Sequence, residues 1–260
     1  MIGGSVVSGS GSKLVLIRAV GPTLANQGLS QSEVLADPVI EVHQGQPVIA
    51  TNDNWGDNSN VAEITSVGSQ IGASALAAGD TKSSALLLRL QPGVYSFVAS
   101  GKAGTSGVVL LEVFAADPTV TNASFVNIST RAYSTTGNGV MIGGFVVSGN
   151  TPKQLLLRAV GPTLTSQGIA SSDVLTDPMI ELHDANHGNV IIATNDDWGS
   201  NAHADSIVSA GARIGAAPFD SADTKSAALL ISVQPGVYTF IASGKSASSG
   251  IVLVEVYDAD

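Results

Sequence analysis

Apolar residues occur along this chain in short stretches of five to eight residues, bounded by Gly, Pro, Asn or Asp. Stretches of this length are typical of β-strands. Residues 95–100 alternate in the way expected of a strand with one buried face, whereas residues 85–88 are apolar on both faces. This mixture predicts two sheets packed face to face. In the first half of the chain, strands are predicted at residues 2–8, 14–19, 39–43, 48–52, 84–90, 94–100 and 108–114.

Residues 61–71 have helical spacing instead. Val61, Ile64, Val67 and Ile71 recur at intervals of three or four, and Asn60 with Glu63 resembles a capping box. We therefore expect one short helix in this half.

The pattern repeats in the second half. Residues 12–24 reappear at 152–164, both ending in Arg-Ala-Val-Gly-Pro-Thr-Leu, and residues 51–56 reappear at 194–199. The correspondence continues to the end of the chain, with an offset of 140 that becomes 143 near His187. The sequence therefore predicts an internal duplication with two β-sandwich domains in tandem, each with one short helix. We place repeat 1 at residues 1–117 and repeat 2 at residues 141–260, and we assign the strand predicted at 124–130 to repeat 2.

A segment between the copies, residues 118–140, has no counterpart elsewhere. Residues 124–130, around Phe125, alternate like a strand, and residues 136–139 supply a turn. Two sandwiches thus share one such strand, and it completes repeat 1, repeat 2 or another chain. A sandwich without it has an open edge that can pair with another strand. Either a neighbouring repeat of a longer array supplies the missing strand, or strand addition between molecules builds a fibre.

Composition narrows the partners. The net charge is −10 and the 11 Lys and Arg residues form no run, so a nucleic acid or an anionic membrane surface is not an expected partner. No apolar stretch reaches the roughly 18 residues needed for membrane insertion. The chain has no Cys, which excludes disulfides, thiolate zinc sites and cysteine nucleophiles and suits an exported protein.

The repeated segments together resemble a known kind of module. Arg-Ala-Val-Gly-Pro-Thr-Leu, Asn-Asp-x-Trp-Gly, Gln-Pro-Gly-Val-Tyr and Glu-Val-Tyr-Asp-Ala resemble tandem β-sandwich repeats of large secreted bacterial proteins, similar to pre-peptidase C-terminal (PPC)-type domains. The resemblance covers both copies almost completely. It implies an all-β, jelly-roll-like module, often associated with calcium, without catalytic activity.

The Asn-Asp-x-Trp segment is the strongest candidate site, because it places several oxygen donors at the end of a strand. Calcium prefers six to eight oxygen ligands. The candidate metal ligands are Asn52, Asp53, Asn54, Asp57 and Asp80 in repeat 1 and Asn195, Asp196, Asp197 and Asp223 in repeat 2. The alternative is that these residues only form Asx-turns. A bound calcium would be structural, since no nucleophile or base accompanies it.

Charged residues within predicted strands are a second set. Arg18, Glu41, His43 and Glu112 recur as Arg158, Glu181, His183 and Glu255. Paired carboxylates suggest a glycosidase. Charged residues in strands more commonly face solvent or pair with each other, however, and alternation places Glu41 and His43 opposite Ile40 and Val42. We expect no catalytic residues and no enzyme.

Trp55 and Trp198 have two interpretations. An exposed Trp stacks on sugars, whereas a Trp after a turn commonly closes a core.

The sequence therefore predicts a non-enzymatic, extracellular or cell-surface structural protein, a subunit or repeat of a self-associating fibre, surface layer or adhesin. Its partner would be itself or a neighbouring repeat. The alternative is an accessory module of a secreted enzyme that binds calcium or a polysaccharide.

Overall fold

The computed structural model describes every residue except 118, 119 and 121 of the predicted linker. The described chain forms two compact units, Met1–Val126 (unit 1) and Asn127–Asp260 (unit 2). The division between them falls inside the strand that lies between the two sequence repeats.

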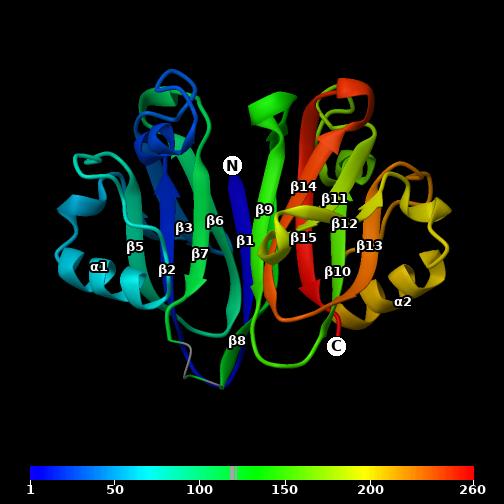
Figure 1. Ribbon diagram of the computed structural model, residues 1–260, viewed down its shortest axis with the longest axis horizontal. Helices are drawn as coiled ribbons and strands as arrows, with labels where there is room; N and C mark the ends of the chain where they lie inside the picture. Colours follow the sequence, from blue (N-terminus) through cyan, green and yellow to red (C-terminus); the bar gives the residue numbers. More distant parts are fainter. Residues whose placement is uncertain (118–119, 121) are drawn as a thin grey trace. The chain divides into compact units, whose positions relative to one another are not determined.

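Unit 1 contains two antiparallel sheets (Figure 1). Four strands, in the order β1-β6-β3-β4, form one sheet, and three strands, in the order β5-β2-β7, form the other. The strand bounds are β1 Ile2–Gly9, β2 Lys13–Val20, β3 Pro38–Gln44, β4 Val48–Asn52, β5 Ser84–Leu90, β6 Gly93–Gly101 and β7 Leu110–Ala115.

Unit 2 has the same order of elements with one strand more. Its sheets are β9-β14-β11-β12 and β8-β15-β10-β13, all antiparallel. The strand bounds are β8 Ala123–Ser134, β9 Met141–Val147, β10 Lys153–Val160, β11 Pro178–Asp184, β12 Val190–Asn195, β13 Ala227–Val233, β14 Gly236–Gly244 and β15 Gly250–Asp258.

The predicted all-β architecture is confirmed, and the seven strands predicted in the first half match β1 to β7 to within two residues at each end. The strand predicted at 124–130 is longer than expected, because β8 continues to Ser134 before a short 3-10 turn, Gly137–Gly139, leads into β9.

Each unit has its own apolar core between its sheets. Phe97 and Phe240, at equivalent places on β6 and β14, are almost completely buried, and each contributes roughly 1.5–3 kcal/mol of hydrophobic stabilisation. On β3, Ile40 and Val42 are buried while Glu41 and His43 point to the outer face, as the alternation predicts.

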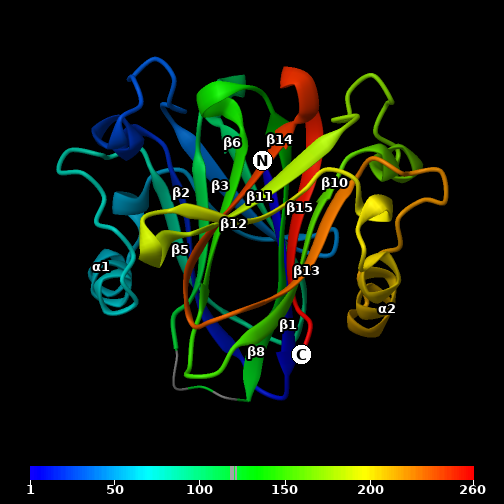
Figure 2. The same cartoon turned by 45° about the vertical axis from the view of Figure 1, so that its right-hand side comes forward.

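In each unit an α-helix lies against one sheet (Figures 1 and 2). In unit 1, α1, Val61–Gln70, lies beside β5 and β2. In unit 2, α2, Ala204–Ile214, lies beside β13 and β10. Ile64 of α1 is buried against Leu16 and Ala85. The predicted helix in the first half is confirmed, but the capping box is wrong. Asn60 makes no side-chain cap hydrogen bond, because its amide faces the Glu63 carboxylate at 3.5 Å.

Candidate functional site

The Asn-Asp-x-Trp segment closes the outer edge of the sheet that carries the helix. The Asn52 Oδ1 atom accepts a hydrogen bond from the backbone N–H of Ala85 at 3.0 Å, and the Asn58 Nδ2 group donates to the Ala85 carbonyl at 3.0 Å. Asn195 and Asn201 bind Ala228 in the same way in unit 2. These amides therefore satisfy backbone groups that an edge strand would otherwise expose.

Asp80 anchors a different contact. Its carboxylate accepts five hydrogen bonds, from the N–H and hydroxyl of Thr23, the N–H of Lys82 and the N–H and hydroxyl of Ser83. Burial raises the pKa of Asp80, but the hydrogen bonds from Thr23, Ser83 and Lys82 together outweigh burial, so the pKa is lowered. This carboxylate ties the Gly-Pro-Thr-Leu segment to the start of β5.

Asp223 repeats this arrangement in unit 2, with five hydrogen bonds from Thr163, Lys225 and Ser226. Its pKa is lowered by the same balance, in which burial opposes the hydrogen bonds. Sequence reasoning missed Thr23 and Thr163. The signal that could have found them is their retention in both copies of Gly-Pro-Thr-Leu.

The remaining predicted ligands lie on the surface, next to Lys side chains. Asp53 pairs with Lys102, and the hydrogen bond from this Lys is the main cause of the lowered pKa of Asp53. Asn54 donates to Asp53 at 3.2 Å and to Asp57 at 3.0 Å. In unit 2, Asp196 pairs with Lys245, which lowers the pKa of Asp196, and Asp197 pairs with Lys225 at 3.1 Å.

The nine predicted ligands thus divide among three arrangements: edge amides, buried carboxylates and surface ion pairs. Asp53, Asn54 and Asp57 are brought together, whereas Asp80 is directed at Thr23 and Ser83. Within the described residues, no group of three or more acidic or His side chains has the geometry to hold a metal ion. Calcium binding at the Asp53 and Asp196 clusters stays a prediction.

Both Trp residues are half-buried against the helix side of their unit. The Trp55 indole N–H donates to the Asp80 carbonyl and the Trp198 indole to the Asp223 carbonyl, each at 2.7 Å. Trp198 also stacks on Phe219, with ring centroids 4.8 Å apart. Packing of this kind is what the core interpretation expects.

The charged strand residues form two separate pairs in each unit. Arg18 and Glu112 lie directly opposite on β2 and β7, with Nη2 and Oε2 2.5 Å apart, and Arg18 also donates to the Ser74 carbonyl. Glu41 and His43 pair on β3 of the other sheet at 3.2 Å.

Unit 2 repeats both pairs. Arg158 Nε lies 3.1 Å from Glu255 Oε2, and His183 lies 3.2 Å from Glu181. Glu255 also accepts from the Tyr257 hydroxyl, whose pKa is raised by burial and by the Glu255 charge. In both units the two carboxylates that a glycosidase would need belong to opposite sheets of the sandwich.

The strand edges differ most between the units. In unit 2, residues 127–134 of β8 pair antiparallel with residues 250–257 of β15, for example Thr130 with Val254 and Ile128 with Val256. The first residues of β8 belong to unit 1, where Ala123 and Phe125 pack with the core. In unit 1, β7 corresponds to β15, and in the described part of the chain β7 has one strand neighbour, β2.

The direction of the β7 backbone groups follows from one hydrogen bond. Ala116 donates its N–H to Leu14 of β2 at 2.8 Å. Because successive residues of a strand point their backbone groups to opposite sides, Phe114 and Glu112 also face β2. Leu111, Val113 and Ala115 therefore point their N–H and C=O groups to the other side of β7.

The other edges of unit 1 carry features that discourage strand pairing. The β3 and β4 pairing has a register shift between Val42 and His43, and β5 is closed by the Asn52 and Asn58 amides. The β2 and β7 register runs without a shift, and β7 contains no Pro, Lys or Arg. The far side of β7 is the least protected edge of unit 1.

The sheets β1-β6-β3-β4 and β9-β14-β11-β12 carry exposed aliphatic side chains, which are a second surface feature of interest. These are Val48, Ile49 and Val94 in unit 1 and Ile142, Val146, Val190, Ile191, Ile192 and Val237 in unit 2. Contiguous apolar surface on a sheet can mark a contact with another protein.

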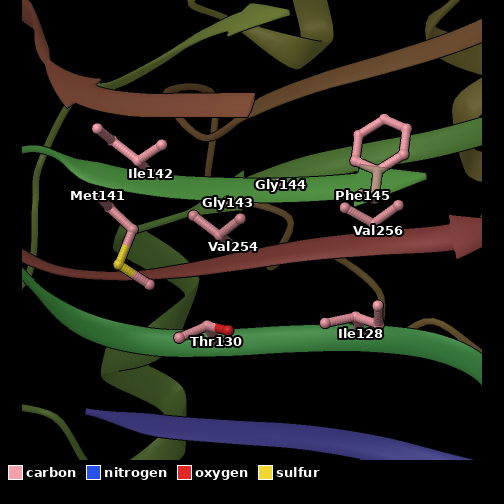
Figure 3. A pocket seen from close by; sticks show the side chains of 9 residues that line it. All are labelled: Ile128, Thr130, Met141, Ile142, Gly143, Gly144, Phe145, Val254 and Val256. Carbon is pink, nitrogen blue, oxygen red and sulfur yellow. The ribbon is translucent and has the colours of Figure 1, made fainter. Parts of the chain in front are cut away.

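A hollow lies in unit 2 where β9 passes over β8 and β15 (Figure 3). Its apolar lining includes Ile128, Phe145 and Val254, and its volume is about 30 Å³. That volume holds about one water molecule. The hollow is therefore too small for a sugar or a cofactor.

In the described residues, no helix is both long and apolar enough to cross a membrane. Comparison with protein-family models gives no match, and no curated protein matches the chain. Among solved structures, the chain is 9% identical to the VP2 subviral particle of infectious bursal disease virus, covering 98% of this chain and 58% of the viral chain. The TM-score of 0.19 is too low to indicate a shared fold.

Proposed function

We propose that this chain is a non-enzymatic extracellular structural protein, a subunit or repeat of a self-associating assembly joined through β-strand pairing. The observation that carries the proposal is the contrast between β15, which is covered by β8, and β7, whose far side has no strand neighbour among the described residues. A regular, uncovered edge is a template for strand addition.

The proposal includes a duplicated jelly-roll domain. Unit 2 has eight strands in two four-stranded antiparallel sheets, as a jelly roll requires. The described residues of unit 1 form the same strands without an equivalent of β8 beside β7. An origin by tandem duplication explains why the sequence motifs, ion pairs and buried Asp residues recur at equivalent positions.

A structural role is also supported by how the polar residues are used. Asp80, Arg18 and Asn52, which the sequence offers as site residues, bind groups of their own unit. Calcium at the Asp53 and Asp196 clusters would add stiffness to the same loops.

Sedimentation velocity over a range of protein concentrations, with negative-stain electron microscopy, tests this proposal. We expect large ordered assemblies. The Leu110→Lys variant places a charge beside the β7 edge and should reduce assembly, while Val94→Lys adds the same charge to the outer sheet face as a matched control.

Repeating both measurements with calcium and with a chelator tests the metal. A monomer at every concentration, with and without calcium, would overturn the proposal. Loss of assembly in Val94→Lys alone would move the contact from the β7 edge to the sheet face.

A further inference from the structure

We infer that the far side of β7 binds an extended donor strand with the chemistry of β8, antiparallel and in the register that β8 has on β15. The donor alternates apolar or small residues with polar residues and comes from another molecule or another repeat. This inference rests on the proposed function, because it names the partner of the same strand edge.

The two acceptor strands have similar sequences. Residues 110–114 of β7, Leu-Leu-Glu-Val-Phe, correspond to residues 253–257 of β15, Leu-Val-Glu-Val-Tyr. On the edges that face β2 and β10, β7 and β15 pair in the same register. Arg18 lies opposite Glu112, and Arg158 lies opposite Glu255. The backbone of β7 is thus already held in the conformation that accepts a strand in unit 2.

Side-chain burial shows what the missing strand would cover. On the inner face of β15, Val252 and Val254 are 0% and 4% exposed. Their counterparts on β7, Val109 and Leu111, are only half-buried. A donor strand would therefore bury apolar surface as well as supply hydrogen bonds.

The number of strands identifies the source of the donor. The described chain has two such acceptor strands, β7 and β15, and β8 pairs with β15 alone of the two. Exchange of β8 between two copies would cover one edge and uncover another. The donor for β7 is therefore a further strand of the β8 type that is not engaged on β15, supplied by a neighbouring repeat or by another copy whose own β8 is released.

The register follows from unit 2. There, Leu253 pairs with Arg131, Val254 with Thr130 and Val256 with Ile128. The donor residues equivalent to Arg131, Thr130 and Ile128 should therefore pair with Leu110, Leu111 and Val113. The backbone groups of donor positions 128, 130 and 132 would face β7.

Disulfide trapping in the full chain tests this register, since the chain contains no Cys. A synthetic peptide of residues 122–135 carrying Arg131→Cys is mixed with the Leu110→Cys protein under mild oxidation. Opposite positions in this register bring the two Cα atoms within the range a disulfide requires, below about 7 Å. We expect efficient cross-linking.

Three controls isolate the edge. A peptide carrying Asn127→Cys in place of Arg131→Cys should cross-link at least 10-fold less, because its thiol lies out of register. N-methylation at Ile128 and Thr130 should abolish cross-linking, whereas N-methylation at Asn127 and Ser129 should preserve it. The Leu253→Cys protein, whose edge is covered by β8, should not react.

Equal cross-linking by both peptides, or none by either, would overturn the inference. The outcome is separable from that of the proposed function. If the protein cross-links in register but sediments as a monomer, the assembly proposal fails and the inference that β7 accepts a donor strand stands. Assembly of the protein without peptide cross-linking would leave the assembly proposal and overturn the inference about the β7 edge.

Discussion

The two units of this chain contain the same cores, ion pairs and buried carboxylates, and they differ chiefly in one strand. In unit 2, β8 lies against β15, and Val252 and Val254 on the inner face of β15 are buried. In unit 1, the matching face of β7 is half-buried and its far side has no strand neighbour in the described chain. A nearly complete sandwich can therefore keep its internal hydrogen-bond network while one strand edge is left for a partner.

The largest expected effect lies in the network that both units share. Asp80→Ala and Asp223→Ala each leave buried donors of Thr, Ser and Lys residues without an acceptor. Each should lower the free energy of unfolding of its own unit by about 3 kcal/mol or more. Urea unfolding, followed by Trp55 fluorescence in a Trp198→Phe background and the reverse, reports each unit separately.

Asp80→Asn and Asp223→Asn are milder controls that keep the side-chain shape. If only one of Asp80→Ala and Asp223→Ala lowered the free energy of unfolding of its unit, the buried carboxylate would not stabilise both units.

The next effect should separate the units. Val256→Pro removes an N–H that faces β8, whereas Val113→Pro removes the equivalent N–H from the uncovered side of β7. Both variants lose the same Val side chain. Val256→Pro should therefore be more destabilising than Val113→Pro by about 1–2 kcal/mol, measured by the same urea titrations. Equal losses would show that the far side of β7 is already hydrogen-bonded.

Acid should weaken both units to a similar extent. The pKa values of Asp80 and Asp223 are lower in the folded chain than the value of about 3.9 expected in the unfolded chain. The stability they contribute is therefore present above about pH 4 and is lost as the pH falls through the lowered values. Urea midpoints between pH 5 and pH 2 should fall less steeply for Asp80→Asn than for the parent protein. The same slope in both would contradict this role.

The smallest effect concerns two glycines that face the opposite sheet of their unit, Gly3 opposite Leu111 of β7 and Gly143 opposite Val254 of β15. A Cβ atom at Gly143 would lie 3.8 Å from the Val254 side chain, an ordinary contact, whereas one at Gly3 would lie 2.9 Å from Leu111. Gly143→Ala should stabilise unit 2 by about 0.5–1 kcal/mol, and Gly3→Ala should give no gain because Leu111 must move. Thermal unfolding measures both. A gain in stability for Gly3→Ala would mean that Leu111 moves aside at little cost.

Much of the fold could be predicted from sequence because apolar alternation determines which residues are buried. The strands around Tyr95 and Phe97 and the helix at Val61 follow directly from that pattern. The capping box at Asn60 did not form, since a local motif competes with other hydrogen bonds available to the same side chain.

The candidate site was harder to predict. The sequence places Asp53 and Asp80 in one candidate calcium site because both carry carboxylate oxygens and lie in one region of the chain. In the structure Asp53 pairs with Lys102 and Asp80 with Thr23. These partners lie 49 and 57 residues away, and local spacing carries no information about them. The choice of β15 as the neighbour of β8 is equally non-local.

Residue-resolved amide hydrogen exchange shows whether the far side of β7 is an open strand edge. We expect strong protection of the Val254 and Val256 amides on β15 and fast exchange of the Leu111 and Val113 amides on β7. The β7 amides should become protected when the peptide of residues 122–135 is added. Equal protection of all four amides in the protein alone would show that β7 has no open edge.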